Sequence, residues 1–208
     1  GIQSTLELII VLFAFLAAFF GLWVINALFR NKLKELFSDA QFFIFFFLVF
    51  GYSLYALGEV TWFLIFNLFE IYSVGSMPDI YWVTGMVLML FPLLALSPRL
   101  YRVYGAGRSS LPLLITGAAL FFLAIFYVVR IGGSSLDYYY GGMSALIVIA
   151  SAPLVIFYRQ LRDARAFEAN LMYLFFGNVS FLITQFIYSY TVPRDIYGTL
   201  GMLADTMY

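Results

Sequence analysis

Residues 41–69 read QFFIFFFLVFGYSLYALGEVTWFLIFNLF. This run holds one Asp, Glu, Lys or Arg side chain, Glu59, and exceeds the about 20 apolar residues that a helix needs to cross a bilayer. Because lipid offers no hydrogen-bond partners to a backbone, such a run is stable in a membrane as a helix. It therefore predicts a transmembrane helix that carries a carboxyl group at membrane depth.

The same apolar pattern recurs along the whole chain. Of its 208 residues, 64% are apolar and 11% are charged, whereas soluble domains carry about 25% charged residues. A surface facing water does not accommodate this much apolar area. We therefore expect an all-α integral membrane protein of seven transmembrane helices, at residues 5–29, 41–69, 78–96, 111–129, 140–158, 171–190 and 195–208.

Local signals indicate where several helices begin and end. Ser38, three residues before Gln41, is expected to start the second helix as a capping-box residue. Pro98 lies just beyond the expected end of the third helix, where prolines are common. The pairs Gly132-Gly133 and Gly141-Gly142 indicate loop flexibility around the fifth helix.

The basic residues lie mainly in alternate loops. By the positive-inside rule these loops face the cytoplasm, which puts the N-terminus outside a cell membrane and the C-terminus inside. The helix at 195–208 would be about 21 Å long, shorter than the about 30 Å hydrocarbon core, so we expect it to continue past residue 208. Nine of the eleven Lys and Arg lie in these loops: Arg30, Lys32, Lys34, Arg99, Arg102, Arg108, Arg159, Arg162 and Arg165.

Two short motifs each occur twice. Residues 79–86 read DIYWVTGM and residues 195–202 read DIYGTLGM, while GEVTW at 58–62 matches GNVSF at 177–181. Such spacing indicates two parallel three-helix repeats, related by an axis along the membrane normal. We therefore predict one membrane domain, residues 1–208, with repeats at 5–97 and 138–208 joined by a linker helix at 111–130.

Polar side chains at membrane depth are costly, so each is a candidate functional residue. At 100° per residue, the polar residues of the helices 41–69 and 171–190 each share a face, which we expect to line the bundle interior. Aromatic residues in the outer halves would complete an outward-facing pocket with an acidic floor. The predicted ligand-binding residues are Glu59, Trp62, Asn67, Tyr81, Asn178, Gln185, Tyr188 and Asp205.

The amino-acid composition limits the reactions and metal ligands that the predicted pocket could provide. The chain has no His and no Cys, which removes the commonest general base and the commonest metal ligands, so we predict no catalytic residue and no metal. A bound lipid is the one cofactor to be considered, and zero net charge gives no indication of a nucleic-acid partner. Glu59 also has a purely structural interpretation, as a hydrogen-bonded acid that joins helices.

Three features of the sequence resemble a known group of membrane proteins. They are the segment Ala56–Trp62 (ALGEVTW), the acidic loop residue Glu70 and the later Pro78-Asp79-Ile80-Tyr81. They resemble the seven-helix membrane sensor regions of prokaryotic histidine kinases and diguanylate cyclases, although Pro78 stands directly beside the Asp here. The resemblance implies a receptor-like signal-input module that acts through its last two helices. Its partners would be a small ligand outside and a cytoplasmic signalling domain or partner chain inside.

Two other classes of membrane protein share this architecture. SWEET-type sugar transporters also have a three-one-three plan, but this chain lacks their Pro-Gln signature; Glu59 and Asp205 would relay protons in a transporter. Rhodopsin-like photoreceptors need a lysine in the last helix, and the only lysines here are Lys32 and Lys34. A small-solute or proton-coupled transporter is therefore the alternative to a sensor.

Overall fold

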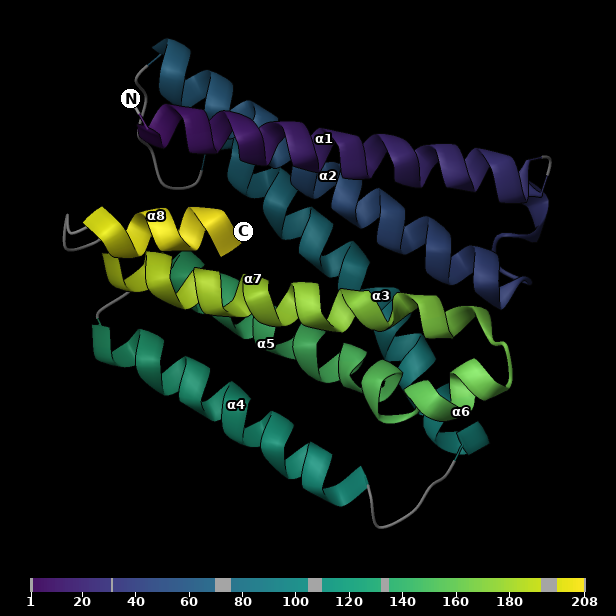
Figure 1. Cartoon of the computed structure of the whole chain (residues 1–208). Coiled ribbons are helices and arrows are strands. Elements are labelled where there is room, and N and C mark those ends of the chain that lie inside the picture. Colours follow the sequence, from purple (N-terminus) through teal and green to yellow (C-terminus); the bar gives the residue numbers. More distant parts are fainter. Residues whose placement is uncertain are drawn as a thin grey trace. The chain divides into compact units, whose positions relative to one another are not determined.

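The computed structural model describes residues 2–30, 32–69, 76–104, 110–131, 135–191 and 198–207. Within these ranges the secondary structure is entirely helical, with α-helices and two short 3-10 helices. The elements are α1 (Ile2–Phe29), η1 (Leu33–Glu35), α2 (Ala40–Phe69), α3 (Met77–Tyr104), α4 (Ser110–Ile131), α5 (Ser135–Ile156), α6 (Tyr158–Asp163), η2 (Phe167–Leu171), α7 (Met172–Thr191) and α8 (Gly198–Met207) (Figure 1).

Five of these helical segments are long and apolar enough to cross a membrane. They lie in α1, α2, α3, α5 and the η2–α7 segment, and α4 adds a 22-residue helix with an apolar centre. The prediction of an all-helical protein with apolar helices of spanning length is thus confirmed. In the described ranges the structure has eight α-helices, and the seven spans and the three-one-three repeat stay predictions.

Two helices extend beyond their predicted bounds by about five residues or more. We expected the third helix to end before Pro98, but α3 continues to Tyr104. A proline removes one backbone hydrogen bond, and the buried side chains of Leu96 and Leu100 hold the helix together on both sides of it. The fifth helix begins at Ser135, so Gly141 and Gly142 lie inside α5 and are not loop residues, whereas Gly132 and Gly133 lie outside the described residues. Gly141 is buried there, consistent with close helix packing.

The start of α2 differs from the predicted cap by one residue. One carboxylate oxygen of Asp39 accepts hydrogen bonds from the backbone N–H groups of Gln41, at 2.9 Å, and of Phe42, at 3.1 Å. The Ser38 hydroxyl donates instead to the carbonyl oxygen of Glu35, at 3.1 Å. Asp39 is therefore the N-cap, because its side chain satisfies N–H groups that the first helical turn leaves without partners.

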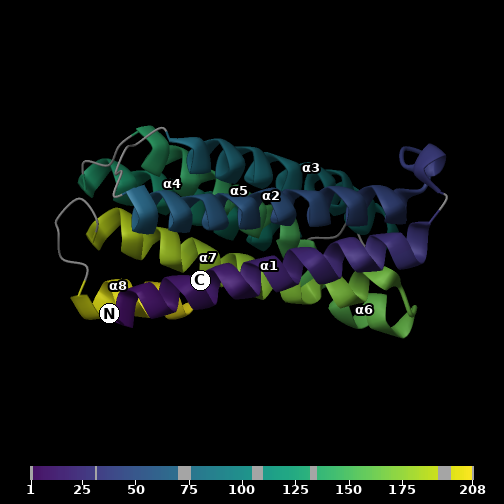
Figure 2. The ribbon, with the colours of Figure 1, turned by 90° about the horizontal axis from the view of Figure 1, so that it is seen from above.

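The chain forms two compact units, Gly1–Pro92 and Leu93–Tyr208, so α3 contributes to both. In the first unit α1 and α2 run side by side along their length, as Figures 1 and 2 both show. At the end of this hairpin the rings of Phe29 and Phe42 stack at 4.5 Å. Midway, a Cβ atom on Gly21 would lie 2.8 Å from a methyl carbon of Val49, so glycine lets the two helices approach closely.

In the second unit α5 is the central helix, because it packs on both α4 and α7. Small residues on α4 and α5 let these helices approach, and larger side chains of α4 and α7 pack around them. The antiparallel helix α8 is joined to α7 by the Ser180 hydroxyl, which donates to the carbonyl oxygen of Met207 at 2.7 Å. The core residues are Ala124, Ala145, Val148 and Leu182, surrounded by Phe121, Phe175, Val179 and Phe186.

Candidate functional site

In the first unit the backbones of α2 and α3 touch at a pair of glycines. A Cβ atom on Gly85 would lie 2.7 Å from the carbonyl oxygen of Gly51, and one on Gly51 would lie 2.8 Å from the carbonyl oxygen of Gly85. Backbone atoms cannot rotate out of the way as a side chain can. Only glycine therefore permits this crossing of the two helices.

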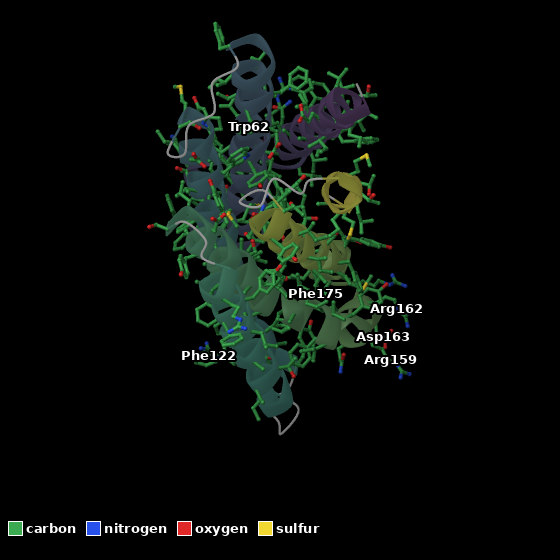
Figure 3. All side chains as sticks on the ribbon, turned by 90° about the vertical axis from the view of Figure 1, so that its left-hand side faces the viewer. Trp62, Phe122, Arg159, Arg162, Asp163 and Phe175 are labelled. Atoms are coloured by element: carbon green, nitrogen blue, oxygen red, sulfur yellow. The ribbon has the colours of Figure 1, made fainter. Side chains whose placement is uncertain are left out.

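About two helical turns after Gly51 on α2, an aromatic cluster lies between α2 and α3. It consists of Tyr55, Trp62 and Trp82. The indole of Trp82 on α3 lies over Gly58, where a Cβ atom would be 2.5 Å from Cδ1 of the ring. Ring centroids of Trp62 and Trp82 are 5.9 Å apart, and those of Tyr55 and Trp82 are 6.3 Å apart. Trp62 can be found among the side chains around the blue ribbons of α2 and α3 in Figure 3.

Glu59 lies on α2 beside this cluster. It is one turn from both Tyr55 and Trp62, within about 60° of each around the helix at 100° per residue. Glu59 is 8% exposed and takes part in an interaction within the protein, so its carboxyl group is buried and is not free. A buried acid next to electron-rich rings is suited to hold a positively charged or hydrogen-bond-donating group.

The structure describes the side chains of six of the eight predicted site residues. Tyr81 is half-buried on α3. Asn67 lies in α2 and Asp205 in α8, and both of their side chains fall outside the described part of the chain. Glu59, Trp62, Asn67 and Tyr81 belong to the first unit, whereas Asn178, Gln185, Tyr188 and Asp205 belong to the second. That these two sets form a single pocket stays a prediction.

The predicted polar face of α7 is present in the second unit. Asn178 is 6% exposed and Ser189 is buried, with Gln185 half-buried on the same face. Thr184 points in another direction and is completely buried, and its hydroxyl oxygen has no hydrogen-bond partner among the described residues. Such an unsatisfied buried group is uncommon, and sequence reasoning did not select this residue.

The main residue that sequence reasoning missed in the first unit is Tyr55. The signal was available, because Gly51, Tyr55, Gly58 and Trp62 follow one another at intervals of four, three and four and so share one face of α2. The proposed repeat partner of Gly58 behaves differently, since a Cβ atom on Gly177 would meet nothing within 4 Å.

No metal-binding group emerges in the described ranges, where no three His, Cys, Asp or Glu side chains gather. No family model, curated protein or solved structure matches the chain. Functional inference therefore rests on the chemistry of these residues.

Proposed function

We propose that the chain is a membrane-embedded, receptor-like sensory module that binds a small cationic ligand beside Glu59. The observation that supports this is the buried carboxyl group on α2, one turn from Tyr55 and Trp62, with Trp82 completing the aromatic cluster. Aromatic faces attract cations, and the attraction strengthens where water is excluded. A carboxylate beside them supplies the opposite charge.

Burial of the site supports sensing. Because Glu59 is buried, a ligand that reaches its carboxyl group has to displace neighbouring side chains. Binding is then coupled to a rearrangement of α2 and α3, and the ligand favours the arrangement that accommodates it. The glycine contact between Gly51 and Gly85 is a close crossing that such a rearrangement would change.

The signal would leave through the helices predicted at 171–190 and 195–208. In the proposed orientation the N-terminus is outside and the C-terminus is cytoplasmic, following the distribution of basic residues. The receiver would be a cytoplasmic signalling domain or partner chain, as the resemblance to kinase and cyclase sensor regions implies.

The test uses tetramethylammonium as the probe and uncharged tert-butyl alcohol as its control. In lipid nanodiscs, a Trp23→Phe variant leaves Trp62 and Trp82 as the two tryptophans, whose fluorescence is excited selectively at about 295 nm, where tyrosine hardly absorbs. We expect a saturable fluorescence change with the cation and none with the alcohol. Glu59→Gln should weaken the response about 10-fold or more, because it removes the negative charge that attracts the cation at a site from which water is excluded. Asp137→Asn, in the second unit, should leave it unchanged.

Absence of a saturable response to the cation would refute this site. Reconstitution into liposomes addresses the alternative directly. Solute or proton flux that is lost in Glu59→Gln would contradict the sensory function and favour a transporter.

A further inference from the structure

An arginine-rich surface lies at one end of the second unit. Three arginines come from α6 and the turn after it, and two come from the last two turns of α3. All five side chains are exposed, and they face only two acids in these segments, of which Glu168 is buried. The arginine surface consists of Arg99, Arg102, Arg159, Arg162 and Arg165.

α6 is oriented so that its cations point outward. Leu161 is fully buried and Phe157, just before the helix, is 4% exposed, so the apolar side of this segment faces the unit. Arg159 and Arg162 extend from the opposite side, away from the ribbon (Figure 3). Arg162 lies over the ring of Tyr158 at 6.0 Å and has a weak contact with Asp163 at 3.5 Å, where both side chains are more than half exposed.

The length of α3 places this surface at the boundary of the bilayer. With 28 residues the helix is about 42 Å long, whereas the hydrocarbon core is about 30 Å thick. If the apolar N-terminal part spans the core, the last turns emerge at the level of the headgroups. Tyr101 and Tyr104 of those turns contact Phe157, with ring centroids 5.3 and 6.2 Å apart, so α6 starts at the same level.

We propose that the arginine surface binds the phosphate groups of anionic phospholipids. Arginine presents a planar fork of donors that fits phosphate oxygens, and it is less strongly hydrated than lysine. The charge of the described segments, five arginines against Asp163 and Glu168, is +3. Exposed cations at headgroup depth attract an anionic leaflet, and each contributes about fivefold in affinity at low salt. This surface would hold the α5–α7 connection against the membrane independently of the ligand at Glu59.

Site-specific labelling tests the proposal, because the chain has no cysteine of its own. Gln160, exposed between Arg159 and Arg162, is replaced by cysteine and labelled with a fluorophore. Quenching by nitroxide-labelled phosphatidylglycerol is compared with quenching by nitroxide-labelled phosphatidylcholine in vesicles of the intact protein. At about 0.05 M salt we expect the anionic lipid to be preferred several-fold, and the preference to shrink as salt screens the charges.

Substitutions distinguish lipid binding by the arginine surface from a general attraction of the protein to anionic lipid. Arg159→Gln together with Arg162→Gln should bring the ratio of quenching by the anionic lipid to quenching by phosphatidylcholine close to one. The matching pair of Arg→Lys substitutions should retain part of the preference for the anionic lipid. Arg130→Gln, which removes an exposed charge at the end of α4, should change nothing. Equal quenching by the two lipids at low salt, or a preference that survives the glutamine pair, would overturn the proposal. Loss of the preference on adding millimolar inorganic phosphate would also overturn it, because the surface would then bind a soluble anion.

Discussion

Replacing Gly85 by alanine tests the close crossing of α2 and α3. The added methyl group would lie 2.7 Å from the carbonyl oxygen of Gly51 and 3.0 Å from the backbone nitrogen of Tyr55. Ordinary van der Waals contact begins at 3.4 Å, so the helices have to separate by about 0.7 Å (3.4 − 2.7). A gap of that size forfeits a quarter to a half of the dispersion energy of the atoms packed nearby.

The expected magnitude follows from two opposing effects. Overpacking costs about 1–3 kcal/mol, and the upper end applies because the obstructing atoms belong to the backbone. Alanine is favoured over glycine inside a helix by about 1 kcal/mol. The Gly85→Ala variant should therefore lose about 2 kcal/mol of unfolding free energy.

Gly177→Ala is the matched control. Gly177 is an exposed glycine inside α7, and no atom lies within 4 Å of an added methyl group, so the same substitution should stabilise by about 1 kcal/mol. Equilibrium unfolding in mixed detergent micelles, followed by tryptophan fluorescence, measures both. The two substitutions are expected to differ in sign and by about 3 kcal/mol.

Equal effects of the two substitutions would refute the crossing. A double variant adds a second check, because Gly51→Ala pushes on the same contact. Once the helices have separated for one methyl group, the second should cost less, so the two destabilisations should not add.

Three further outcomes follow from local geometry. Arg165 has a φ of 52° and is the left-handed residue of a Schellman turn, in which the N–H of Ala166 donates to the carbonyl oxygen of Leu161 at 2.8 Å. Because glycine adopts this conformation without steric cost, Arg165→Gly should raise the free energy of unfolding by about 1 kcal/mol. A lower free energy of unfolding would contradict this. Ser180→Ala should remove the bond to α8 and increase amide hydrogen exchange there without affecting α1. Asp39→Ala should cost about 1 kcal/mol in the same unfolding assay, whereas Ser38→Ala should cost little.

The helix positions were predictable because their cause is local. An apolar run of sufficient length forms a helix in lipid whatever surrounds it, so α1, α2 and α7 were predicted within three residues at each end. The extension of α3 past Pro98 depends on tertiary burial of Leu96 and Leu100, which the residues around a proline do not reveal.

The candidate site was partly predictable for a related reason. A lone acid in an apolar helix is conspicuous, so Glu59 was selected, and Trp62 with it. Tyr55 was missed because an aromatic residue in a membrane helix usually faces lipid or the interface, and only its register with Gly58 indicates otherwise. The contact of Trp82 with Gly58 depends on how α2 and α3 cross, which no single-helix pattern specifies.

The contrast between α1 and α5 bears on how the protein is made. In the most apolar 18-residue window of α1 no residue is buried, whereas 56% of the corresponding window of α5 is buried. During synthesis α1 can therefore pass into lipid by itself and remain there without partners. α5 exposes glycine, serine and alanine until both of its neighbours are present, and α7 is translated after it. α5 is itself apolar enough to enter lipid, but its small residues gain their packing partners only once α7 has been made, so we expect the α5–α7 pairing to be a late step of assembly.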